Sequence, residues 1–183
     1  MIRHRTCLWR RLAACVVLAI LTAAAGQGVA AAASLSEKEV QILVRAIGFL
    51  QPPPTGAATI AVAYDASNPA SKQDAEAIAS YFGEGLKAGG ATLTPKLIEV
   101  RQLPSGGFVA IIAAAGVRIE QIADAARVLH VACVTGDLNA VESGQCVMTV
   151  KSEPKVEIII NRAAAARANV GFGTAFLMMI RQI

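Results

Sequence analysis

The polar residues best spaced for ligand chemistry follow the β-forming segment 59–64. Asp65, Ser67, Asn68 and Ser71 come directly after it and just before a helical pattern. In an open α/β sheet this place is the carboxyl end of a strand beside a helix N-terminus, where ligands and anions commonly bind. The same residue types also cap helices and close loops, and that structural role is the simpler interpretation.

Residue types suited to catalysis or metal binding are sparse in residues 34–183. His130 is the single histidine there, with no acid or nucleophile beside it in sequence. No G-x-S-x-G pattern occurs, and Gly171-Phe172-Gly173 lacks the third glycine of a dinucleotide fingerprint. One histidine and two cysteines leave a tetrahedral metal site unfilled. We expect no enzyme activity, cofactor or metal, and a hydrolase using His130 is the catalytic alternative.

Residues 1–33 have the layout of a cleavable secretory signal peptide. A basic stretch ends at Arg11, an apolar run covers 12–25, and small residues continue to Ala33. The apolar run is shorter than the ~20 residues that span a bilayer, so a permanent anchor is the weaker alternative. The sequence predicts cleavage near Ala33 and export of residues 34–183 to the periplasm, without a stable membrane anchor.

Removal of this segment changes the charge of the protein. Four of the seventeen Lys and Arg residues lie in it and none of the thirteen acids does, so thirteen of each remain. A near-neutral chain has no basic surface to attract phosphates, which argues against nucleic-acid binding. About 150 residues remain, enough for a single domain with one core.

Cys133 and Cys146 are the two cysteines of residues 34–183. In an oxidising compartment an even pair favours a disulfide. We predict that segments 131–135 and 146–150 are strands that pair antiparallel. That pairing puts Cys133 opposite Cys146 at a Cα separation that a disulfide tolerates.

The elements that position these residues alternate between strand and helix. Ser36 can cap a first helix, which the prolines at 52–54 end. Beyond it the pattern predicts strands over 59–64, 93–100, 108–113, 131–135, 146–151 and 155–160, with helices over 72–88, 119–129 and from 162 onward. This order predicts an α/β fold: a single three-layer domain with a mixed, mostly parallel sheet, helices on both faces and an antiparallel C-terminal meander.

The last third of the chain carries a family resemblance. A strand over 157–161 ends in Ile-Asn and is followed by a helix, a short break and a closing helix through Leu177. This arrangement resembles the YfiR family, with Glu157, Ile160, Asn161 and Leu177 as the matching residues. The segment 46–52 is similar to the family's opening helix, although Gln51 stands where the family commonly has Trp. The resemblance covers essentially all of residues 34–183.

The resemblance implies a periplasmic regulator rather than an enzyme. Such a protein binds the periplasmic domain of an inner-membrane diguanylate cyclase and represses it, which lowers cyclic-di-GMP signalling and biofilm formation. It also implies disulfide-dependent stability and a homodimer, for which the apolar segment 172–180 could serve unless it fills the core. The residues alone support one alternative, a periplasmic small-molecule (solute) binding protein related to transporter receptor lobes and binding at Asp65–Ser71.

Overall fold

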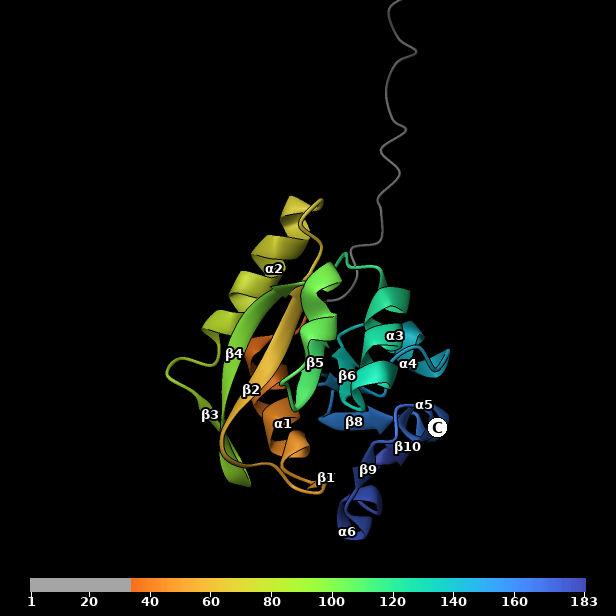
Figure 1. Cartoon of the computed structure of the whole chain (residues 1–183). Coiled ribbons are helices and arrows are strands. Elements are labelled where there is room, and N and C mark those ends of the chain that lie inside the picture. Colours follow the sequence, from red (N-terminus) through yellow and green to blue (C-terminus); the bar gives the residue numbers. More distant parts are fainter. Residues whose placement is uncertain (1–33) are drawn as a thin grey trace, which may run out of the picture. The chain divides into compact units, whose positions relative to one another are not determined.

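The computed structural model describes residues 34–183, and the predicted signal peptide with its cleavage site at Ala33 lies outside them. Within residues 34–183, no helix has both the length and the apolar character needed to cross a bilayer. Figure 1 shows these residues as a twisted sheet with helices packed on either side of it.

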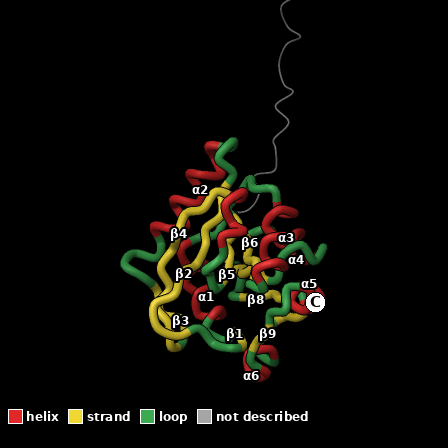
Figure 2. The backbone as a smooth tube through the Cα atoms, viewed as in Figure 1, coloured by secondary structure: helices red, strands yellow, loops and turns green. Residues whose placement is uncertain are grey.

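The centre of the described region is an eight-stranded mixed sheet in the order β10-β8-β7-β6-β5-β2-β4-β3, with its strands yellow in Figure 2. Five neighbouring strands run parallel: β2 (Thr55–Tyr64), β4 (Gly90–Glu99), β5 (Ala110–Ala113), β6 (Ala132–Thr135) and β7 (Met148–Lys151). The apolar runs predicted around 59–64 and 108–113 lie in β2 and β5, near the middle of the sheet. Strands covered on both faces need such uninterrupted apolar runs.

The edges of the sheet are shorter and partly antiparallel. β3 (Leu86–Ala88) pairs antiparallel with β4, and β8 (Glu157–Ile160) pairs antiparallel with β7. β10 (Arg181–Gln182) adds a short parallel strand beside β8. A separate two-stranded ladder joins β1 (Leu50–Gln51) to β9 (Gly171–Phe172). The predicted antiparallel C-terminal meander is confirmed by the β7–β8 pair.

The helices divide between the two faces of the sheet. α1 (Glu37–Ile47), α2 (Pro69–Ser80) and α5 (Arg162–Arg167) belong to one buried cluster, together with α6 (Thr174–Leu177). α3 (Ile119–Leu129), α4 (Leu138–Glu142) and the 3₁₀ helix η1 (Val100–Ser105) belong to the other. The strands alternate accordingly, since Ile60 and Val62 face the first cluster while Ala61 and Ala63 face the second. The predicted three-layer α/β fold is confirmed.

The first helix is fixed at its start by a capping box. The Ser36 hydroxyl accepts from the Glu39 backbone N–H, and the Glu39 carboxylate accepts from the Ser36 backbone N–H at 2.9 Å. The other Glu39 oxygen accepts from the backbone N–H and the hydroxyl of Ser152 at 3.0 and 3.2 Å. Burial raises the pKa of Glu39, but the bonds from Ser36 and Ser152 outweigh it and hold the pKa below its usual value. Glu39 therefore ties α1 to the turn after β7.

The predicted antiparallel pairing of the two cysteine segments is wrong. β6 and β7 are parallel neighbours, with Val134 opposite Met148. The reason is α4, a helix that is absent from the elements predicted above. Asp137 caps it by accepting from the Asn139 backbone N–H at 2.9 Å, and its single turn carries the chain back to the start of the next strand.

Two predicted helices are shorter than expected. The helix predicted over 72–88 ends at Ser80, because Gly83 and Gly85 take positive φ values of 53° and 132° and turn the chain into β3. The apolar segment after residue 171 is not one closing helix but β9, the single turn α6 and β10. Phe172 pairs with Leu50 across the β1–β9 ladder, which removes it from any helix.

Candidate functional site

The first candidate site is the loop after β2. The chain passes from β2 to β4 on one side of the sheet and later to β5 on the other, so the carboxyl ends of β2 and β5 form a topological switch point. Asp65, Ser67, Asn68 and Ser71 lie there, as the sequence predicted. The sheet also brings Gly116, which follows β5, to the same place.

The carboxylate of Asp65 forms its hydrogen bonds within its own loop. Its Oδ1 accepts from the Ser67 hydroxyl at 2.6 Å and from the Ser67 backbone N–H at 2.9 Å, while its backbone N–H donates to the Ser71 hydroxyl at 3.1 Å. The two bonds from Ser67 are the main reason why the pKa of Asp65 lies below its usual value, and the positive charges of Arg118 and Arg101 lower it further. The carboxylate is therefore ionised near neutral pH, but its hydrogen bonds stabilise the turn.

The other polar side chains near this loop also form hydrogen bonds within the protein. Asn68 caps α2 by accepting from the Ala70 backbone N–H at 3.2 Å, and its amide donates to the Gly116 carbonyl at 3.3 Å. Asp74 accepts from the Ala115 backbone N–H at 2.7 Å and from the Ser34 hydroxyl. A Cβ on Gly116 would lie 2.5 Å from the Asn68 amide nitrogen, so the two loops touch directly. The switch point is held together by its own hydrogen bonds.

The second candidate site is a cavity of about 470 Å³ at the opposite ends of the strands, which we call the disulfide cleft. One wall is α3, the other is α5, and the turn 143–145 before β7 closes one side. Cys133, Ala126, Val147, Ala164 and Ala168 give it an apolar floor. A volume of this size is typical of small-molecule sites.

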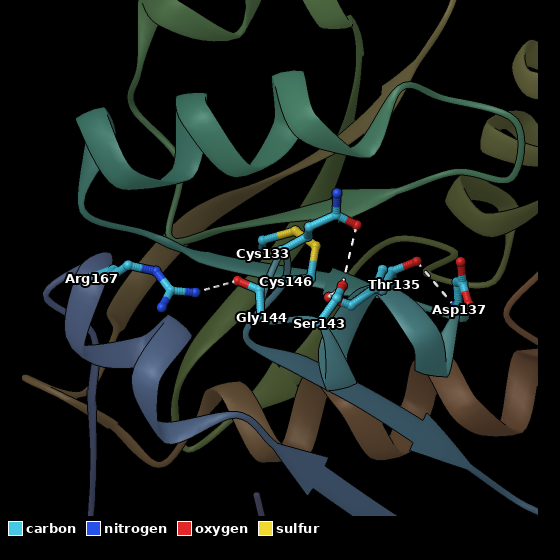
Figure 3. The surroundings of a disulfide bond; sticks show 9 residues. Cys133, Thr135, Asp137, Ser143, Gly144, Cys146 and Arg167 are labelled. Atoms are coloured by element: carbon cyan, nitrogen blue, oxygen red, sulfur yellow. Dashed lines mark hydrogen bonds between the residues drawn. A yellow bond between two sulfur atoms is a disulfide. The ribbon is translucent and has the colours of Figure 1, made fainter.

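The disulfide Cys133–Cys146 lies beside this cleft (Figure 3), and the predicted bond is confirmed. The two Cα atoms are 4.9 Å apart, and both side chains are almost fully buried. The bond joins β6 to Cys146, two positions before β7, so it fastens the turn 143–145 to the sheet. The disulfide forms although the strands are parallel, because Cys146 precedes the register in which they pair.

Charged side chains of both signs surround the cleft. Glu120, Asp124 and Arg127 follow one another at i, i+4 and i+7 along α3, which puts them on a single helix face. Arg127 pairs with Asp124 on the same helix. Glu120 accepts from the Gln145 amide at 3.0 Å, which links α3 to the turn.

Arg167 of α5 reaches the cleft from the other wall (Figure 3). Its guanidinium donates to the Gly144 carbonyl at 2.6 Å. Gly144 has a φ of 77°, and a Cβ there would lie 2.6 Å from the Arg167 Nη2, so the turn and the arginine fit together only around glycine.

Of the residues that match the YfiR pattern, only Asn161 lies near the disulfide cleft, close to Gly144. Asn161 is buried, caps α5 by accepting from the Ala164 backbone N–H at 2.9 Å, and donates to the Val141 carbonyl at 2.9 Å. Ile160 is in the core, and Glu157 lies 4.0 Å from Arg181 in a weak ion pair. Leu177 is partly buried in α6, where its carbonyl accepts from Gln182 at 2.6 Å. Asn161 is the one of these residues whose side chain fixes the backbone directly after β8.

His130 ends α3 in a left-handed conformation, with φ 56°, and it is exposed. In the part of the chain that the structure describes, no group of three or more His, Cys, Asp or Glu side chains could hold a metal ion. Of the apolar segment 172–180, Phe172 and Phe176 fill the core, whereas Met178 and Met179 are 78% and 72% exposed.

Comparison with known proteins gives a fold and no family. No protein-family model matches the chain, and no curated protein matches it. A conserved domain protein from Vibrio cholerae O1 biovar El Tor is a structural neighbour, with 14% identity, a TM-score of 0.51 and 81% of this chain covered. Another is the ABC domain in complex with L-Trp from Streptococcus pneumoniae, with 13% identity, a TM-score of 0.52 and 81% covered. The match spans 60% and 62% of those two chains.

The disulfide cleft does not follow from the sequence pattern. Glu120, Asp124, Arg127 and Arg167 stand on exposed helix faces, where charges usually meet only water, and Gln145 lies in an ordinary polar turn. The one usable signal was Cys146, since a disulfide next to a Ser-Gly turn marks a place where several elements converge.

Proposed function

We propose that the protein is a non-catalytic regulatory binding protein of the YfiR type, exported to the periplasm. In this role it binds the periplasmic domain of an inner-membrane diguanylate cyclase and represses it, which lowers cyclic-di-GMP and biofilm formation. The observation that carries the proposal is Asn161, the central residue of the resemblance. Its buried side chain links the end of β8 to α4 and α5, so this signature residue occupies a structural junction.

Other features fit a binding role. The side chains of Asp65 and Asn68 already bond to Ser67 and to the Gly116 carbonyl. Few of their polar atoms at the switch point therefore remain to take part in a reaction. Met178 and Met179 present large apolar side chains that a partner protein would cover. The same side chains suit the homodimer that the resemblance implies.

The direct test is deletion of the gene followed by measurement of cyclic-di-GMP and biofilm. We expect both to rise and to return to the starting level when the protein is supplied again. Unchanged cyclic-di-GMP, together with no co-purification of a membrane cyclase, would refute the proposal. Met178→Lys and Val128→Lys change two similarly exposed side chains in different parts of the domain. The variant that represses the cyclase less well identifies the part of the surface that contacts it.

A second candidate function is supported by the disulfide cleft and by the likeness to a domain whose structure contains L-Trp. We propose as this alternative a periplasmic protein that binds a small solute. A ligand that binds only the folded protein raises its melting temperature, so a thermal-shift screen of small metabolites tests it. If no compound shifts the melting temperature at millimolar concentration, the alternative fails.

A further inference from the structure

We infer that the disulfide cleft binds a small zwitterion, a molecule with an ammonium group, a carboxylate group and a compact apolar body. This inference rests on the second proposed function and specifies its ligand and its site. It moves the site from the predicted Asp65–Ser71 loop to the other ends of the strands.

The first argument is the charge balance of the cleft. Two arginines and two acids line it, so its net charge is zero while both signs are present. A net-neutral cleft with separated poles does not favour a simple anion or a simple cation, but it does favour a dipolar ligand. Arg127 and Asp124 already neutralise each other on α3.

The second argument is that the other two charges are not paired with each other. Among residues 34–183, Arg167 has no carboxylate partner, and its single side-chain hydrogen bond goes to the Gly144 carbonyl. Glu120 lies on the opposite wall, in α3, and its carboxylate accepts a hydrogen bond from the neutral amide of Gln145. A guanidinium has five N–H donors in a planar fork, so most of those of Arg167 remain for a carboxylate. Glu120 correspondingly offers an acceptor to an ammonium group.

The third argument is that small apolar side chains line part of the cleft. Ala126 of α3, Val147, and Ala164 and Ala168 at α5 line the cleft beside these charged groups, and all four are buried apolar residues. A ligand body placed between Arg167 and Glu120 would cover these small side chains, and burial of its apolar surface would add affinity. Small floor residues leave room for a branched aliphatic group.

The experiment uses the oxidised protein, residues 34–183, and three probes of one shape. L-Leucine carries both charged groups, isoamylamine carries the ammonium alone, and 4-methylpentanoate carries the carboxylate alone. We expect calorimetric titration to detect L-leucine and to find each analogue bound at least tenfold more weakly, since each leaves one charged wall unused. Equal affinity for all three probes would overturn the inference.

Variants locate the site. Arg167→Ala and Glu120→Gln should each weaken L-leucine binding at least tenfold. Arg167→Ala should leave isoamylamine binding unchanged, so that the preference for L-leucine over isoamylamine disappears. Arg181→Ala is the matched control, because Arg181 is another exposed arginine that lies outside the cleft, and it should leave binding unchanged. Unfolding curves of each variant show whether a loss of binding is a loss of fold.

The outcomes separate this inference from the function on which it rests. If another class of solute shifts the melting temperature and Arg167→Ala removes that shift, the protein binds a solute in the cleft, but the proposed ligand class is wrong. If L-leucine binds but neither cleft variant weakens it, the location is wrong. If no solute shifts the melting temperature, both fail.

Discussion

The two ends of the parallel strands use polar side chains in opposite ways. At the carboxyl ends of β2 and β5, Asp65 bonds within its own loop, while Asn68 and Asp74 bond to the segment that follows β5. At the other ends, beside the disulfide, Arg167 and Glu120 keep unused bonding capacity toward a cavity. Polar residues at a strand end are therefore not a ligand site by position alone. What distinguishes the two ends is how much of each side chain is already bonded.

The largest expected effect is loss of stability when the disulfide is removed, and it should be confined to the end of the strands where the disulfide lies. Replacing both cysteines, Cys133→Ala with Cys146→Ala, removes a bridge between residues 13 positions apart and should cost about 3 kcal/mol in unfolding free energy. Urea denaturation measures this loss. Hydrogen exchange should quicken at 143–147 while the Asp65–Ser71 loop keeps its protection. Equal quickening at both ends would show that the disulfide does not act locally.

A second comparison sets Asn68→Ala against Arg167→Ala. Asn68 both caps α2 and bonds to the Gly116 carbonyl, so its loss should cost about 1–2 kcal/mol. Arg167 is exposed, and its loss should cost less than about 0.5 kcal/mol. Denaturation curves of the two variants give both values. An Arg167→Ala cost as large as that of Asn68→Ala would mean that the arginine is structural.

A third comparison concerns two buried threonines in neighbouring strands. Among residues 34–183, the Thr149 hydroxyl is buried without a hydrogen-bond partner, whereas that of Thr135 accepts from the Asp137 backbone N–H at 3.1 Å. Thr149→Val should therefore stabilise the protein by up to about 1 kcal/mol, and Thr135→Val should destabilise it by about the same amount. Melting temperatures of the two variants check the opposite signs. Destabilisation by both substitutions would show that Thr149 is hydrogen-bonded in solution.

The smallest effect is the pH dependence of the Asp65 turn. Because the hydrogen bonds from Ser67 lower the pKa of Asp65 in the folded protein, its contribution to stability is complete above the unfolded pKa of about 3.9. That contribution is lost as the pH falls through the lower folded pKa. Carboxyl NMR titration should give a raised Asp65 pKa in Ser67→Ala, and no change in Arg167→Ala.

The regular part of the fold could be predicted from the sequence. The uninterrupted apolar run in β2 and the periodic face of α3 are local patterns, and each specifies its own element. The placement of Asp65 and Asn68 at a strand end followed from the same patterns. Which groups they bond could not be predicted, because Gly116 is 48 residues away from Asn68.

The parts that could not be predicted depend on short turns and on distant packing. α4 has five residues, too few for a periodic signal, yet it decides whether β6 and β7 are parallel. Phe172 stands in an apolar run that is typical of a helix, but pairing with Leu50 draws it into a strand. The disulfide cleft needs α3 and α5 to face each other, which no local pattern records.

The carboxylate of Glu39 has a consequence for how the chain is made. One of its partners, Ser152, is 113 residues further along, and α1 packs against β7 as well as β3. The first helix therefore leaves the ribosome long before its binding surface is complete. Any fragment released before Ser152 keeps the apolar side of that helix uncovered, which marks incomplete chains for chaperones and proteases.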